Sequence, residues 1–66
     1  MNLDEASEKF LALEAALNAE LQNCEKEQQA GRTGIEPYHR ARALSEKLTL
    51  EAEVLSKELE KALASL

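Results

Sequence analysis

The stretch "QQAGRTGIEPYH", residues 28–39, interrupts a chain that otherwise follows a helical pattern almost from end to end. Gly31 supplies the positive-φ residue at which helices often stop. Pro37 suits the first turn of a following helix, because the N–H that proline lacks would have no partner within that helix. Thr33 and Glu36 have the spacing of a capping box, but an earlier helix start would place Glu36, directly before proline, in a disfavoured α conformation. The pattern therefore predicts a turn that begins at Gly31 and a second helix that begins at Pro37.

Apolar residues on both sides of this turn recur every three or four positions, which is the spacing of one helix face. Before the turn, this stripe consists of Leu3, Ala6, Phe10, Leu13, Leu17, Leu21 and Cys24. After the turn, it consists of Ala41, Leu44, Leu48, Ala52, Leu55, Leu59, Ala62 and Leu66. We therefore expect residues 1–66 to form one all-α domain, an antiparallel, coiled-coil-like two-helix hairpin with helices over 3–30 and 37–64 and a turn over 31–36.

Folding the two stripes onto each other predicts a register along the whole hairpin. The alignment pairs Leu3 with Leu66, Leu13 with Leu55, Leu17 with Ala52, Leu21 with Leu48 and Cys24 with Leu44. It also places Arg40 and Arg42 beside Glu25 and Glu27, where exposed ion pairs are each worth only ~0–1 kcal/mol. At the start of the first helix, Asn2 and Glu5 have the spacing of a capping box.

Composition excludes several classes of function. The 66 residues carry a net charge of −5, which argues against nucleic acid and against an anionic membrane surface. No apolar run approaches the ~20 residues that span a bilayer, and the first ten residues lack the features of a secretory signal. The single cysteine, Cys24, allows no internal disulfide, so we expect a reducing, cytoplasmic setting.

The sequence offers no constellation typical of catalysis, and we expect a protein that is not an enzyme and holds no metal or cofactor. His39 is the only histidine, and Cys24 belongs to the apolar stripe, where it behaves as a small hydrophobic residue. Glu51 and Glu53 point to different helix faces. The two glycines, Gly31 and Gly34, belong to the turn and to no phosphate-binding motif.

Each helix keeps most of its circumference outside the predicted seam. Helical-wheel geometry places six apolar residues on one flank of the hairpin: Ala12, Ala16, Ala19, Ala43, Leu50 and Val54. We interpret this flank as a candidate docking surface for another helix, anchored by Leu50 and Val54, although isolated exposed apolar residues also occur without any function. A weaker second contact zone on the opposite flank would comprise Leu11, Tyr38 and Leu63.

A local group of basic residues follows the turn on an otherwise acidic chain: Arg32, His39, Arg40, Arg42 and Lys47. A solvated helix face explains this group most simply. The alternative is an electrostatic contact with an acidic partner that weakens with added salt.

The arrangement resembles the YscE-like proteins, the small helical-hairpin co-chaperones of the type III secretion needle subunit. The resemblance covers residues 13–55. Leu21, Cys24 and Gly31 close the first helix, Tyr38 comes early in the second, and Leu48 follows ten residues later. The resemblance implies a cytoplasmic protein without enzymatic activity that pairs with a larger chaperone built of TPR-like helical repeats. Through that chaperone it would help to keep a self-polymerising needle subunit monomeric until export.

A different class of function also fits these residues. The same hairpin could form a homodimeric four-helix bundle, a structural, adaptor or regulatory module in which the flank packs on a second copy of itself. A third hypothesis, a regulator that binds the surface of one enzyme, carries less weight. The partner, the stoichiometry and the docking flank are therefore left open at this stage.

Overall fold

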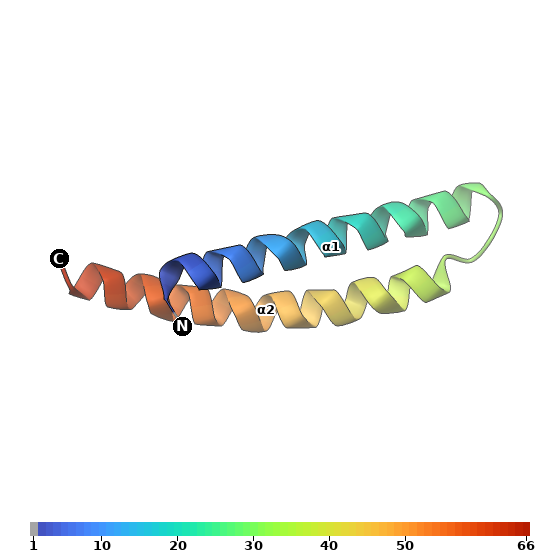
Figure 1. The fold of residues 1–66 in the computed structure, drawn as a ribbon. Coiled ribbons are helices and arrows are strands. Elements are labelled where there is room, and N and C mark those ends of the chain that lie inside the picture. The colour runs from blue at the N-terminus through green and yellow to red at the C-terminus, as the bar shows by residue number, and fades with distance from the viewer. Residues whose placement is uncertain (1) are drawn as a thin grey trace.

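A computed structural model of the protein describes residues 2–66 and shows two long helices joined by a short turn (Figure 1). Helix α1 spans Leu3–Gln29 and helix α2 spans Ile35–Ala64. The two helices run antiparallel in a rod with extents of 54 × 14 × 14 Å. The predicted all-α hairpin is therefore confirmed; Met1 lies outside the described residues.

Both ends of α1 use the predicted capping residues, Asn2 and Gly31, although residues 2–66 show only one of the two hydrogen bonds of the predicted capping box. At the start, the Asn2 side-chain oxygen accepts a hydrogen bond of 2.8 Å from the Glu5 backbone N–H, as an N-cap residue does. At the end, Gly31 has a φ of +81°. The Gly31 N–H donates to the Gln28 carbonyl at 3.0 Å, and the Arg32 N–H donates to the Glu27 carbonyl at 2.9 Å. This pair of bonds is the Schellman motif, which satisfies the last carbonyls of a helix and reverses the chain.

Helix α2 begins at Ile35, two residues earlier than the predicted start at Pro37. The Thr33 hydroxyl accepts a hydrogen bond of 3.3 Å from the Ile35 N–H, which supports the early start. Pro37 then occupies the third helical position, where a missing N–H still removes no bond within the helix. A residue before proline prefers extended backbone, but Glu36 is helical here because the geometry of the turn outweighs that preference.

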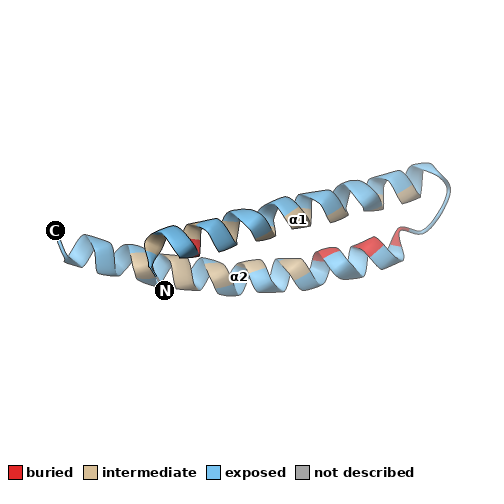
Figure 2. Cartoon of the chain, in the orientation of Figure 1, coloured by how far each residue is buried: buried red, intermediate tan, exposed pale blue. Residues whose placement is uncertain are grey.

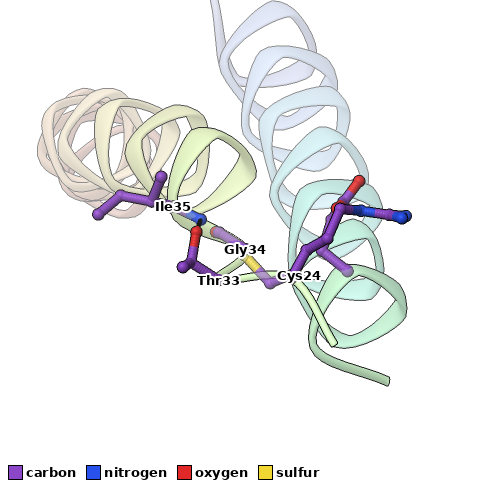
Figure 3. Close-up of polar contacts among 6 residues, drawn as sticks. Cys24, Thr33, Gly34 and Ile35 are labelled. Atoms are coloured by element: carbon purple, nitrogen blue, oxygen red, sulfur yellow. Dashed lines mark hydrogen bonds and ion pairs between the residues drawn. The ribbon is translucent and has the colours of Figure 1, made fainter. Parts of the chain in front are cut away.

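Gly34 brings the turn into direct contact with α1. This residue is buried, adopts a left-handed conformation with a φ of +71°, and accepts a hydrogen bond of 3.7 Å from the Cys24 thiol. A Cβ atom at Gly34 would lie 3.2 Å from the Cys24 carbonyl oxygen, closer than ordinary van der Waals contact. Figure 3 shows Gly34 against Cys24, with Thr33 and Ile35 on either side of it in the chain. Only glycine therefore fits this position without strain.

The predicted register of the two helices was wrong. Cys24 lies against Gly34 rather than Leu44. Further along, the Arg40 side chain binds Glu20 at 2.8 Å, and Lys9 lies 4.0 Å from Glu51. The partners on α2 are therefore displaced by about nine residues, or two and a half turns, from the predicted alignment. The reason is the tightness of the turn, because the chain folds back onto Cys24 within ten residues.

This displacement leaves the last turns of α2 without a neighbour among residues 2–66. Leu3 lies six residues before Lys9 and therefore falls near Lys57, six residues after Glu51, and not opposite Leu66. Every residue from 59 to 66 is exposed. Figures 1 and 2 show this end of α2 projecting past the start of α1.

The contact between the helices is thin. Among residues 2–66, the buried apolar residues of the helix faces are small: Ala6, with no exposed surface, Ala41, which is 5% exposed, and Pro37. The larger side chains of the predicted seam are only half-buried, namely Leu3, Phe10, Leu13, Leu17, Leu44, Leu48 and Leu55 (Figure 2). Five predicted seam residues are exposed: Leu21, Ala52, Leu59, Ala62 and Leu66.

Polar residues and two residues of the predicted flank take part of the seam instead. Glu20, Glu27, Glu51 and Glu58 are half-buried, as are Ala16 and Val54. The predicted stripe of the first helix repeats every 3.5 residues on average, whereas a straight helix repeats every 3.6, so this stripe turns away from the partner helix by ~20° per heptad. Along part of the hairpin, these neighbouring residues therefore lie between the two helices in place of the predicted leucines.

The two turn glycines provide a matched test of the contact at Cys24. We expect Gly34→Ala to lower the free energy of unfolding by about 2–4 kcal/mol, because left-handed strain adds to the clash with the Cys24 carbonyl. Gly31→Ala should cost only about 1–2 kcal/mol, because Gly31 shares the positive φ but has no atom within 4 Å of an added Cβ. Urea unfolding followed by circular dichroism measures both values. Equal losses would contradict a close approach at Gly34.

Candidate protein-binding surface

A shallow groove of about 350 Å³ runs along the flank that the sequence predicts as a docking surface. It is lined by Lys9, Ala12 and Leu13 from α1 and by Lys47, Leu50 and Glu51 from α2. Two of the six predicted flank residues, Ala12 and Leu50, therefore line one hollow although they lie 38 positions apart in the chain. Leu50 is 61% exposed and is the large apolar side chain on the rim of this groove. We refer to these six lining residues as the flank groove.

The other four predicted flank residues lie elsewhere on the helices. Ala19 and Ala43 are exposed and do not line the groove. Ala16 and Val54 are half-buried in the contact between the helices. Val54 therefore packs between the two helices and is not available on the outer flank as the sequence predicts. Leu50 is the predicted anchor that stays exposed on this flank.

The electrostatics of the flank groove were not foreseen from the sequence. Lys9 Nζ lies 4.0 Å from Glu51 Oε1, at the outer limit of an ion pair. The other oxygen of this carboxylate, Oε2, is buried and has no hydrogen-bond partner among residues 2–66. Lys47, on the rim, forms no ion pair in the described part of the chain. The apolar stripes of the sequence do not predict these charged neighbours, because the register between the helices decides which charged side chains lie close together.

The predicted second contact zone does not form a single cluster. Leu11, Tyr38 and Leu63 are all exposed, at 60%, 53% and 66%. Tyr38 lies near the turn, where it makes an edge contact with the His39 ring at 5.8 Å between centroids. Leu11 lies in the first half of α1, far from the turn, and Leu63 lies in the last turns of α2, where every residue from 59 to 66 is exposed. These residues are therefore spread along the rod.

The basic group after the turn is largely neutralised within the chain. Arg32 pairs with Glu27, Arg40 with Glu20, and Arg42 with Glu46 at 3.9 Å. These partners differ from the predicted Glu25 and Glu27 for Arg40 and Arg42, because the register differs. The hydrogen bond to Glu20 raises the pKa of Arg40, and the hydrogen bond to Glu27 raises the pKa of Arg32. A second hollow at the turn is lined by the same two arginines.

Within residues 2–66, no three histidine, cysteine or acidic side chains come together in a way that could hold a metal ion. Cys24 is half-buried, and its thiol faces the Gly34 carbonyl. Neither of the two described helices has a stretch that is apolar and long enough to cross a bilayer.

Comparison of the chain with protein-family models, with curated proteins and with solved structures finds no match. The resemblance to the YscE-like proteins therefore rests on the residues quoted for it. Of these, Gly31 ends α1, Cys24 supports the turn, and Leu48 is half-buried in the seam. Leu21 and Tyr38 are exposed.

Two neighbouring leucines of α2 should respond differently to a charge. Leu48→Asp places a carboxylate in the half-buried seam and should cost about 2–4 kcal/mol, which is enough to unfold so small a hairpin. Leu50→Asp should leave the helical content nearly unchanged, because Leu50 faces the flank groove and is mostly exposed. Val54→Asp should resemble Leu48→Asp, since Val54 is half-buried. Circular dichroism measures all three, and an equal loss of helicity in the first two would exclude a distinct outer flank.

Proposed function

We propose that the protein is a non-enzymatic, cytoplasmic co-chaperone that binds a chaperone of TPR-like helical repeats and so helps to hold a type III secretion needle subunit. The observation that carries the binding role is the flank groove with the exposed Leu50, on a hairpin whose fully buried apolar residues include no large side chain. The identity of the partner rests on the resemblance to the YscE-like proteins.

The physical case for a binding role is the shortage of buried apolar surface. A two-helix hairpin without disulfide or metal has little to offset the conformational entropy lost on folding. A partner that binds only the folded hairpin stabilises it by mass action. Burial of Leu50 alone would contribute about 1.5–3 kcal/mol at the usual ~25 cal/mol per Å² of apolar surface.

The shape and polarity of the flank groove favour a helix as the occupant. A helix laid along two antiparallel helices completes a three-helix layer with apolar side chains in the hollow. A helical-repeat chaperone presents such helices on its surface. An acidic residue on the incoming helix would pair with Lys47, which forms no ion pair within residues 2–66.

The homodimeric four-helix bundle is the alternative. It uses the same flank, with Leu50 packed on a second copy. Each copy carries a net charge of −5, so this arrangement brings two acidic hairpins side by side along their length. For this reason we favour a different protein as the occupant of the flank groove.

The co-chaperone role can be tested with two matched charge variants, one in the flank groove and one outside it. Leu50→Asp and Leu11→Asp introduce the same charge at leucines that are 61% and 60% exposed. We expect the wild-type chain and Leu11→Asp to melt at a markedly higher temperature when the repeat chaperone of a type III secretion system is added. Leu50→Asp should lose this shift. Calorimetric melting of each chain with and without the chaperone measures the effect.

Three outcomes would count against the proposal. A wild-type chain that melts at one temperature with or without the chaperone would refute the co-chaperone role. If Leu50→Asp binds the chaperone normally and Leu11→Asp does not, the flank groove is not the docking surface. A stable dimer that ignores the chaperone and is disrupted by Leu50→Asp would instead support the four-helix bundle.

A further inference from the structure

The projecting end of α2, residues 59–66, is a second apolar surface that the flank groove does not include. We call this segment the overhang. Leu59, Leu63 and Leu66 are 45%, 66% and 98% exposed, and Ala62 is exposed as well. Figure 2 shows the overhang exposed along its length. Five of the eight residues are therefore exposed leucines or alanines at one end of the rod: Leu59, Ala62, Leu63, Ala64 and Leu66.

The overhang continues the stripe by which α2 packs on α1. Leu48 and Leu55 of this stripe are half-buried against α1, and Leu59, Ala62 and Leu66 follow at steps of four, three and four. The stripe loses its neighbour because α1 begins at Leu3, where Asn2 caps the helix. A surface already used for antiparallel helix packing is thus extended by two turns with nothing opposite it among residues 2–66.

We propose that the overhang of a second copy of the chain fills this place, so that two hairpins join end to end about a two-fold axis. A two-fold axis across the overhang makes the two α2 helices antiparallel, which is the orientation that the stripe already uses within the hairpin. An axis between positions 62 and 63 sets Leu59 opposite Leu66 of the second copy, and Leu66 opposite its Leu59. The small Ala62 lies beside the axis, where the two backbones approach most closely.

The eight residues of the overhang set the length of the proposed contact. Eight residues span ~12 Å of helix, so residue 66 of each copy comes close to the first residue of α1, Leu3, in the other copy. The negative end of each α2 then meets the positive end of that α1, a favourable dipole arrangement. The contact is closed, because it uses the same surface on both copies and leaves none for a third.

Charge favours the overhang over the flank for contact between copies. The chain carries a net charge of −5, but the overhang holds one acid and one base, Glu60 and Lys61, which cancel. The end-to-end arrangement also keeps the acidic first halves of the two chains apart. Because so short a contact buries less than the ~1,200 Å² of small stable interfaces, the dimer should be reversible and should form in concentrated solution.

Cysteine cross-linking near the axis tests the proposal. In a Cys24→Ala background, Ala62→Cys places a thiol beside the two-fold axis, and Leu11→Cys places a matched thiol at an exposed site far from it. At high protein concentration and under mild oxidation, Ala62→Cys should give a several-fold higher yield of disulfide-linked dimer than Leu11→Cys. Adding Leu59→Asp to Ala62→Cys should remove this excess, because it sets a carboxylate against Leu66 of the second copy.

Sedimentation of the unmodified chain over a range of concentrations provides an independent readout. We expect a monomer at low concentration, a dimer at high concentration, and a monomer throughout for Leu59→Asp. Equal cross-linking of the two cysteine variants, or a monomer at every concentration, would overturn the proposal. A dimer that Leu50→Asp disrupts and Leu59→Asp does not would overturn it as well.

The result is separable from that of the proposed function. The overhang and the flank groove share no residue, so Leu59→Asp should still gain stability from the repeat chaperone. Conversely, Leu50→Asp should still cross-link through Ala62→Cys.

Discussion

The close approach of Gly34 to the backbone of Cys24 is the contact on which the rest of this hairpin depends. A residue with a side chain at Gly34 would meet the Cys24 carbonyl at 3.2 Å, so the absence of a Cβ allows the chain to turn this tightly. Once Gly34 lies on Cys24, the positions that face each other along the helices follow from the helical rise. The pairs Glu20–Arg40 and Lys9–Glu51 are consequences of that register and, being exposed or half-exposed, add little energy of their own.

The same register determines which apolar residues stay in water. The apolar residues that the contact between the helices buries most completely are small, namely Ala6 and Ala41. The leucines are divided between a half-buried seam, the rim of the flank groove and the overhang. In a larger domain a third element would cover the last two surfaces. Here they remain as candidate contacts with other proteins, and the stability of the hairpin is expected to depend on what covers them.

Local features of the sequence were sufficient to predict the architecture. Asn2 and Gly31 are capping signals that act within one helical turn, and the structure uses both as predicted. The apolar periodicity on each side of Gly31 identifies the two helices, because a buried stripe needs only the 3.6-residue repeat. The early start of α2 at Ile35 is a small departure, caused by the Thr33 hydroxyl and the conformation of Gly34.

The register and the polar part of the flank groove could not be predicted in this way. Leucine stripes with a common spacing match one another in several alignments, and the alignment with the most paired leucines was not the one that the turn permits. Lys9, Lys47 and Glu51 come together only in the observed alignment, so no local pattern marks them as neighbours. Ala16 and Val54 were placed on the outer flank for the same reason, since their burial depends on how far the contact line rotates along each helix.

The register is also the claim that a single measurement tests most directly. In the structure, Leu13 shares one groove with Lys47 and Leu50, whereas the alignment with the most paired leucines would set Leu13 against Leu55. Nuclear Overhauser contacts from the Leu13 methyl groups of the isolated chain distinguish the two arrangements. We expect contacts with the side chains of Lys47 and Leu50. Strong contacts from Leu13 to Leu55 without any to Lys47 or Leu50 would contradict the turn at Gly34, and with it both surfaces derived from that turn.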